Sequence, residues 1–190
     1  MNKNVELENL KQEMLADKTL PLKPANLVFG EGNIDCHVMF VGEAPGEAED
    51  RLIRPFVGRS GKLLDQLLAE ISWQREQVYI TNIVKRRPPE NRDPSPEEIA
   101  VYKPYLAKQI EIIKPKIIAT LGRFSMNYFL PLAKITRDQG KLLEVNGQKI
   151  FPLFHPAAVL RGTVAMKDYQ QSFKRLASAL NNPADNFGPF

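Results

Sequence analysis

The sequence has very little of the chemistry that disulfides and cysteine metal sites require. Its 190 residues include one cysteine, Cys36, which excludes an intrachain disulfide and a metal site built from cysteines. No apolar run approaches the roughly 18 residues that a membrane-spanning helix needs. The segment MNKNVELENLKQEML is charged and lacks the apolar core of a signal peptide. We therefore expect a cytoplasmic protein with no membrane segment and no metal site.

Charge of either sign is not in large excess. The net charge is +4, with 25% charged and 43% hydrophobic residues, as in ordinary globular proteins. This charge favours an anionic partner only weakly. The length suits one domain, which we expect to span residues 1–190, with a loose tail from about residue 181, and to act as a monomer.

Apolar runs alternate with helical patterns along the chain. Strands are expected at residues 37–42, 77–84 and 116–122, with a fourth, which ends near Phe154, in a hairpin turned by Asn146-Gly147. Helices are expected over residues 3–15, from Ser60 onward, after Ser95, over 124–130 and from Met166 to Leu180. This alternation predicts an α/β fold: a three-layer α/β/α sandwich around a central, mostly parallel four-stranded sheet.

The helix after Ser95 has clear boundary signals. Ser95 is the expected N-cap, Pro96 the first helical residue, and Glu98 the partner in a capping box. Pro104 should kink this helix or split it, because proline cannot donate the backbone hydrogen bond.

Three motifs follow the expected strands at the edge where such sheets bind ligands. The first strand ends in Gly42-Glu43-Ala44-Pro45-Gly46, the second near Asn82, and the fourth just before His155. Ligands of open α/β sheets bind beyond the carboxyl ends of the strands. We therefore expect these motifs to form one site.

The glycine-rich stretch VGEAPGEAEDRLIRPFVGRSGKLL is not a standard phosphate-binding loop. A Walker motif needs glycine at Phe56 and a hydroxyl residue at Leu63, and the dinucleotide pattern fails because Glu-Ala-Pro separates Gly42 from Gly46. Ser60 and Gly61 open a helix whose free N–H groups would accept a phosphate, although ordinary helix-start chemistry explains them equally well.

The remaining residues of the expected site suit a flat nucleobase. Phe56 offers an aromatic face, and the Asn82 amide matches a base edge with one carbonyl and one ring N–H, such as that of uracil. His155 would donate a hydrogen bond to an oxygen that gains charge. Taken singly, each of the three has a structural explanation, as a core ring, a turn residue and a structural histidine.

Four blocks in order and at matching spacing resemble the uracil-DNA glycosylase superfamily, most of all its thermostable iron–sulfur class, family 4. The blocks are GEAPGEAEDRLIRPFVGRSGKLLDQLL, VYITNIVKRRPPENRDPSPEE, KPYLAKQIEIIKPKIIATLGR and FPLFHPAAVLR. They run from about Asn26 to Arg161. The resemblance implies an enzyme that hydrolyses the N-glycosidic bond of uracil in DNA and leaves an abasic site.

The resemblance also implies roles for individual residues. It sets Gly42, Glu43 and Ala44 beside the uracil and the attacking water, which Glu43 or backbone carbonyls must hold because Ala44 lacks a polar group. It makes Phe56 the stacking ring, Asn82 the reader of the base edge and His155 the donor to uracil O2. The resemblance further implies that Glu49 and Glu47 guard the C5 position and that Arg161 contacts DNA. The other expected DNA contacts come from the residues themselves: the helix start at Ser60 and Gly61, and the basic cluster of Lys85, Arg86 and Arg87, although such a cluster is more often a solvated loop.

The sequence departs from the pattern of the superfamily in two respects. The cysteines that hold the iron–sulfur cluster correspond to Leu15, Lys18, Arg86 and Tyr102, so we expect no cluster, with Arg86 and Tyr102 packing the vacated space. The covalent class of the superfamily has histidine where KRRPP has proline, which makes covalent capture of the sugar unexpected. A glycosylase for another deaminated base, such as hypoxanthine, and a DNA-binding module without activity remain as alternatives.

Overall fold

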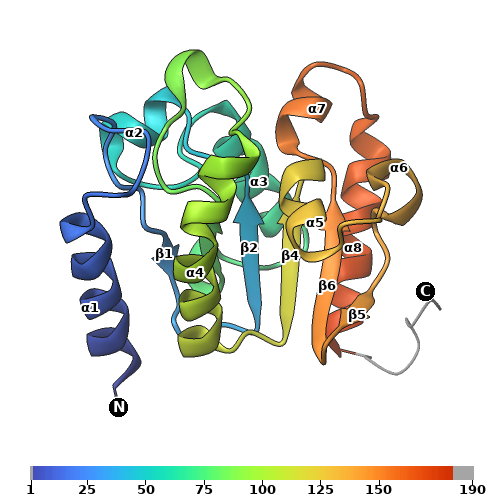
Figure 1. The fold of residues 1–190 in the computed structure, drawn as a ribbon. Coiled ribbons are helices and arrows are strands. Elements are labelled where there is room, and N and C mark those ends of the chain that lie inside the picture. The colour runs from blue at the N-terminus through green and yellow to red at the C-terminus, as the bar shows by residue number, and fades with distance from the viewer. Residues whose placement is uncertain (1, 182–190) are drawn as a thin grey trace.

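The computed structural model describes residues 2–181, and helices alternate with strands through that range (Figure 1). The helices are α1 (Lys3–Ala16), α2 (Glu47–Leu52), α3 (Arg59–Glu70), α4 (Pro96–Ile113), α5 (Arg123–Phe129), α6 (Ile135–Asp138), α7 (Pro156–Leu160) and α8 (Met166–Asn181), with short 3-10 turns at Arg75–Gln77 and Pro89–Asn91. The strands are β1 (Glu31–Gly32), β2 (Val38–Gly42), β3 (Tyr79–Asn82), β4 (Ile117–Leu121), β5 (Leu143–Val145) and β6 (Gln148–Leu153). The expected tail, apart from Asn181, which ends α8, lies outside the described residues.

The sheet has six strands in the order β1-β3-β2-β4-β6-β5, so the expectation of four strands was wrong in number. The four central strands β3, β2, β4 and β6 are parallel, as predicted, and β1 and β5 add antiparallel edges. β1 was missed because two residues carry no periodicity, and β5 because the hairpin was counted as a single strand. The predicted sandwich is otherwise confirmed.

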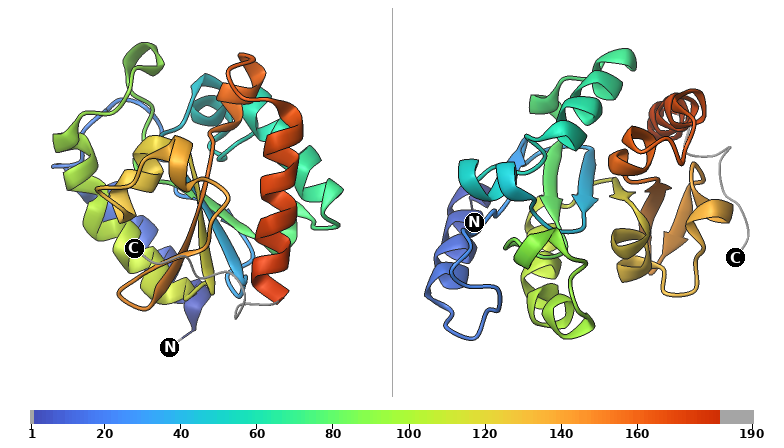
Figure 2. Two further views of the ribbon diagram at one scale, coloured as in Figure 1. Left: turned by 90° about the vertical axis from the view of Figure 1, so that its right-hand side faces the viewer. Right: turned by 90° about the horizontal axis from the view of Figure 1, so that it is seen from above.

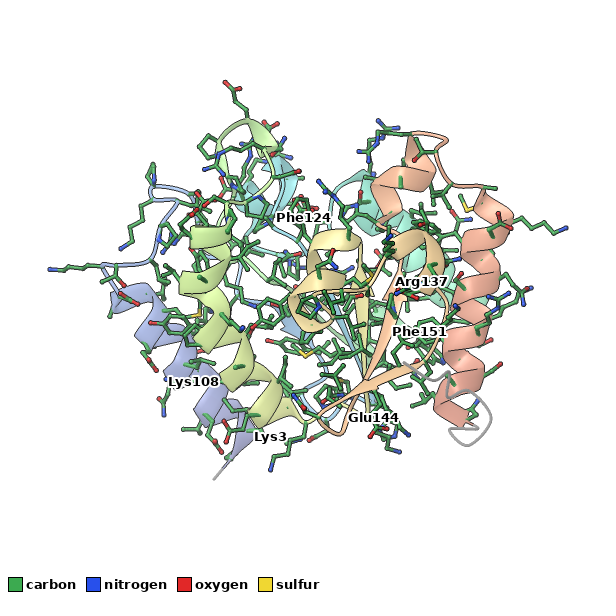
Figure 3. All side chains as sticks on the ribbon, turned by 45° about the vertical axis from the view of Figure 1, so that its right-hand side comes forward. Lys3, Lys108, Phe124, Arg137, Glu144 and Phe151 are labelled. Atoms are coloured by element: carbon green, nitrogen blue, oxygen red, sulfur yellow. The ribbon has the colours of Figure 1, made fainter. Side chains whose placement is uncertain are left out.

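Alternate side chains of the central strands enter two separate cores. In β2, Met39 and Val41 pack with α1, α4 and α5, whereas Val38 and Phe40 pack with α3, α7 and α8. All five β2 residues are buried, as expected for a strand with helices on both faces. Figure 2 shows α4 and α8 on opposite sides of the sheet, and Figure 3 shows Phe151 in the core beside α8.

Local chemistry sets the element boundaries. Ser95 Oγ accepts from the N–H of Glu98 at 3.2 Å, and the Glu98 carboxylate accepts from the N–H of Ser95 at 2.8 Å, which confirms the capping box. Asn146 (φ 51°) and Gly147 (φ 79°) form the predicted hairpin turn between β5 and β6. α4 continues as one helix through Pro104, so of the two expected effects the split does not occur, and the kink remains a prediction.

Packing on both sides of Pro104 explains why α4 continues. Tyr102 and Leu106 are fully buried against the sheet on either side of the proline. Lys108 binds Glu13 at 3.0 Å and so joins the exposed side of α4 to α1 (Figure 3). None of the helices within residues 2–181 is long and apolar enough to cross a membrane.

We predict that Ser95→Ala lowers the free energy of unfolding by about 1 kcal/mol, because the first turn of α4 loses its cap. Urea unfolding followed by circular dichroism measures this. Ser178→Ala is the matched control, since among residues 2–181 the Ser178 hydroxyl bonds only to the carbonyl of Lys174 within α8, at 3.0 Å. Equal losses in the two variants would contradict the assignment.

Candidate active site

The carboxyl ends of the parallel strands bring the three predicted motifs together. Gly42 ends β2, Asn82 ends β3, and His155 follows β6 as the N-cap of α7. α2 and α7 both lie beyond this edge of the sheet (Figure 1). Two neighbouring cavities of about 650 and 600 Å³ open here, and they share Ala44, Gly46, Ser60, Asn91 and His155. The first cavity also contains Phe56 and Asn82, and the second contains Glu43 and Arg161.

Asn82 contributes an unsatisfied polar group to the wall of the first cavity. Its side chain is 1% exposed, and its Oδ1 has no hydrogen-bond partner among the described residues. A buried acceptor without a partner is costly, and at the wall of a cavity a bound ligand can supply the missing donor. The N–H of Ile83 donates to the carbonyl of Gly42 at 2.9 Å and fixes this strand end against β2.

Gly42 allows the amide and an aromatic ring to meet over the end of β2. A Cβ at Gly42 would lie 2.4 Å from Asn82 Oδ1 and 2.5 Å from Cζ of Phe56. Both distances are too short for any side chain. Gly42 therefore shapes the cavity by lacking a side chain.

Phe56 and His155 bound the first cavity from different elements. Their ring centroids are 6.0 Å apart and their planes meet at 38°. Phe56 has a left-handed backbone (φ 49°), which is uncommon for a residue other than glycine. Gly61 accommodates this turn, since a Cβ there would lie 1.8 Å from the carbonyl oxygen of Phe56. Gly61 is buried against that backbone, so its expected contact with DNA phosphate is not available in this structure.

The imidazole of His155 is held as a neutral hydrogen-bond donor. Its Nδ1 accepts from the N–H of Ala157 at 3.1 Å, which leaves Nε2 to carry the proton of the neutral ring. Burial lowers the pKa of His155 to about 4; the positive charge of Arg161 lowers this pKa further, and Glu49 opposes the shift. The ring is therefore uncharged near pH 7 and presents an N–H.

Glu43 is a titratable group of the second cavity with a raised pKa. Burial raises the pKa of its carboxyl to about 7, with Asp93 adding to the shift and Arg123 opposing it. Its backbone carbonyl accepts from the N–H of Val84 at 3.0 Å and ties the first motif to the segment after β3. A carboxyl poised near neutral pH beside a cavity suits proton transfer. Ala44 also lines this cavity, as does Phe124, which is labelled in Figure 3.

Glu49 performs a structural task that the sequence did not reveal. Its Oε1 accepts from the N–H groups of Val57 and Gly58 at 2.9 and 2.8 Å, just before α3. It lines the first cavity, but this oxygen is committed to the backbone beside Phe56. Glu47 is exposed at the same cavity. Exclusion of a C5 methyl group by Glu49 and Glu47 remains a prediction.

Two of the expected DNA contacts require correction. Lys85 is 0% exposed, and its ammonium donates to Thr81 Oγ1 and to Gln109 Oε1 in the core, where burial holds the lysine pKa well below its usual range. Arg86 is 7% exposed and donates to the carbonyl of Ala25. Neither side chain reaches a surface on which DNA would lie.

Two other residues of the predicted DNA-contacting set, Arg161 and Ser60, reach the cavity edges, and Arg87 contacts Asn91 beside them. Arg161 is exposed and Ser60 is partly buried, and both line the second cavity. Arg87 is partly buried and donates from Nε to Asn91 Oδ1 at 2.7 Å. These three residues remain predicted contacts.

Sequence reasoning missed Asn91 and several basic residues of the rim. Asn91 lines both cavities and has a left-handed backbone (φ 55°), which the turn-forming sequence PPEN permits. The missed arginines are Arg51 and Arg59 at the first cavity and Arg123 at the second. They are separated in sequence, so no run of charge signalled them.

The residues present do not fit an iron–sulfur cluster. Of the four positions that the resemblance assigns to cysteine, Leu15 is 45% exposed and Tyr102 is fully buried, its hydroxyl donating to the carbonyl of Pro21 at 3.0 Å. Arg86 occupies the same region through its bond to Ala25. Within residues 2–181, no group of three or more His, Cys, Asp or Glu side chains could hold a metal ion. The absence of a cluster remains a prediction.

Comparisons with known proteins agree with this arrangement. Residues 29–180 match the uracil DNA glycosylase superfamily. A type-4 uracil-DNA glycosylase of Sulfurisphaera tokodaii is 43% identical over 93% of this chain and 86% of its own length. Those of Thermotoga maritima and Archaeoglobus fulgidus are 49% and 41% identical over 75% and 90% of this chain, and over 76% and 91% of their own lengths. The chain belongs to the uracil DNA glycosylase superfamily.

Proposed function

We propose that this protein is a monofunctional uracil-DNA glycosylase, which hydrolyses the bond between uracil and deoxyribose in DNA and leaves an abasic site. The observation that carries the proposal is the buried Oδ1 of Asn82, which has no partner within residues 2–181 and faces a cavity bounded by Phe56 and His155. Uracil offers a ring N–H to that oxygen, and its flat face suits Phe56. The relatives bearing this name support the same reaction.

The base must leave the helix stack to enter the first cavity. Extrusion costs a few kcal/mol, and stacking on an aromatic ring returns roughly 1–3 kcal/mol. The Asn82 amide would accept from N3–H of uracil and donate to O4. Cytosine lacks that N–H and presents a donor in place of O4, so the amide would be mismatched with it.

Cleavage separates charge, and the site offers a group for each side. As the bond from C1′ to N1 breaks, its electron pair passes to the uracil ring, and N–H of His155 Nε2 would stabilise the charge on O2. One preorganised donor of this kind is worth about 3–4 kcal/mol. Water then attacks C1′, and the carboxylate of Glu43 would take its proton.

The rim of both cavities supports a DNA-binding face. Arg51, Arg59 and Arg161 are exposed there and would neutralise phosphates on either side of the extruded nucleotide. Binding should therefore weaken as salt rises. The expectations of a monomer and of a cytoplasmic location remain predictions.

The reaction is tested with labelled oligonucleotides that carry one uracil or one hypoxanthine. After incubation and alkali treatment, we expect a strand break at uracil and none at hypoxanthine. Breakage at hypoxanthine alone would identify hypoxanthine, and not uracil, as the base that the enzyme releases. Retardation on a native gel without any breakage would indicate a binding module instead.

We predict that His155→Ala lowers the single-turnover rate of uracil release by about 10²–10³-fold, because the developing charge on the base loses its donor. The chain has two histidines, and His37→Ala is the matched control. His37 is exposed at a separate cavity with Cys36 and Trp73, before β2 begins. Full activity of His155→Ala would remove His155 from the mechanism.

We predict that uracil release rises about tenfold per pH unit below pH 7 and levels off above it, because Glu43 must be ionised to act as the base. The pKa of Glu43 is raised to about 7, whereas that of His155 is lowered to about 4, so the histidine stays neutral throughout this range.

Glu43→Gln should flatten this profile and lower the rate at pH 8 by about 10²-fold. Assays that are quenched at set times between pH 5 and 9 measure both the shape of the pH profile and the rate at pH 8. An unchanged rising limb in Glu43→Gln would assign the titration to another group.

A further inference from the structure

Arg75, which lies outside both cavities, holds the backbone around Phe56 through hydrogen bonds. Arg75 lies in the 3-10 turn Arg75–Gln77, between α3 and β3, and its side chain is 15% exposed. Its Nη1 donates to the carbonyl oxygen of Phe56 at 3.1 Å, and its Nη2 donates to that of Pro55. Arg75 therefore holds two successive carbonyls of the turn that carries the ring.

Acidic side chains occupy the other donors of the same guanidinium. Nε and Nη2 both donate to Glu31 Oε1, at 3.1 and 3.0 Å, and Nη1 donates to Asp65 at 2.8 Å. A guanidinium has five N–H donors, and five contacts use all of them. The group is thus fixed in orientation by β1 and α3 while it binds the turn.

Opposite charge holds the amide side of the same turn. Glu49 accepts from the N–H groups of Val57 and Gly58, directly after the two carbonyls that Arg75 binds. The left-handed backbone of Phe56 therefore lies between a carboxylate and a guanidinium. Such a conformation persists only where its surroundings determine it.

We propose that Arg75 is a positioning residue for base recognition, which acts by fixing the ring of Phe56 as the surface on which the extruded base stacks. This rests on the proposed function, in which Phe56 stacks on uracil. Without Arg75, the carbonyls of Pro55 and Phe56 lose their donors and the ring loses its fixed place near Gly42 and His155. Arg75 itself lines neither cavity.

The test combines Arg75→Met with Phe56→Ala in a double-mutant cycle. In the wild-type background, Arg75→Met should lower single-turnover uracil release about tenfold, since misplacing a reactant-positioning group is costly. In the Phe56→Ala background it should change release by less than about twofold, because the ring through which it acts is gone. An equal fall in both backgrounds, or none in the wild type, would overturn the proposal.

Arg54→Met is the matched control. Arg54 also pairs with Glu31, at 2.7 Å, but donates to neither carbonyl of the turn. Its side chain is 57% exposed, so its loss should leave release within about twofold of the wild type. A fall equal to that of Arg75→Met would assign the effect to Glu31 and overturn the role of the carbonyl contacts.

Two further measurements keep the test decisive. Arg75→Lys, whose ammonium has three donors in place of the five of the guanidinium, serves if Arg75→Met does not fold, and it should lower release about threefold in the wild-type background alone. Saturation-transfer NMR with free uracil measures base binding without catalysis, and Arg75→Met should weaken it as Phe56→Ala does. Failure of the wild type to release uracil would refute the proposed function, whereas unchanged uracil binding in Arg75→Met would refute this inference alone.

Discussion

The site depends on close backbone approach at the end of β2. Because Gly42 has no side chain, the amide of Asn82 and the ring of Phe56 reach the same point, where a Cβ would lie 2.4 and 2.5 Å from them. β2 and β3 are parallel and in register there, with Gly42 opposite Asn82. The order of the strands thus places a planar amide beside an aromatic face. The shape of the cavity therefore depends on the backbone geometry and not on polar contacts between side chains.

Burial shifts the pKa values of two groups in the same region in opposite directions. It favours the neutral form of each group, so it lowers the pKa of His155 and raises that of Glu43. The histidine becomes a neutral donor at the first cavity, and the carboxyl titrates near neutral pH at the second. One physical cause therefore suits the two groups to the two proposed roles, stabilisation of a departing anion and acceptance of a proton.

The sequence predicted what depends on local pattern and on topology. Apolar runs located the four parallel strands, Asn146-Gly147 located the hairpin, and the rule for parallel sheets brought Asn82 and His155 to one edge. It could not predict side-chain direction in the segment after β3. The run that contains Lys85 and Arg86 has the composition of a solvated loop, yet Thr81 and Gln109 bind the lysine inside the core. Likewise, the spacing of Glu49 gave no sign that it would accept from backbone N–H groups.

The buried basic residues explain how the segment between β3 and α4 is held where the family resemblance implies a cluster. Lys85 connects β3 to Gln109 on α4, while Val28 donates to its backbone carbonyl at 2.8 Å. Arg86 and Tyr102 bind the carbonyls of Ala25 and Pro21, so both attach to the segment between α1 and β1. These contacts lie shortly before Asn91, which lines both cavities and accepts from Arg87 through its Oδ1. The residues that do not reach DNA thus brace the segment whose exposed part lines the site, and hydrogen bonds to backbone carbonyls perform this bracing without cysteine.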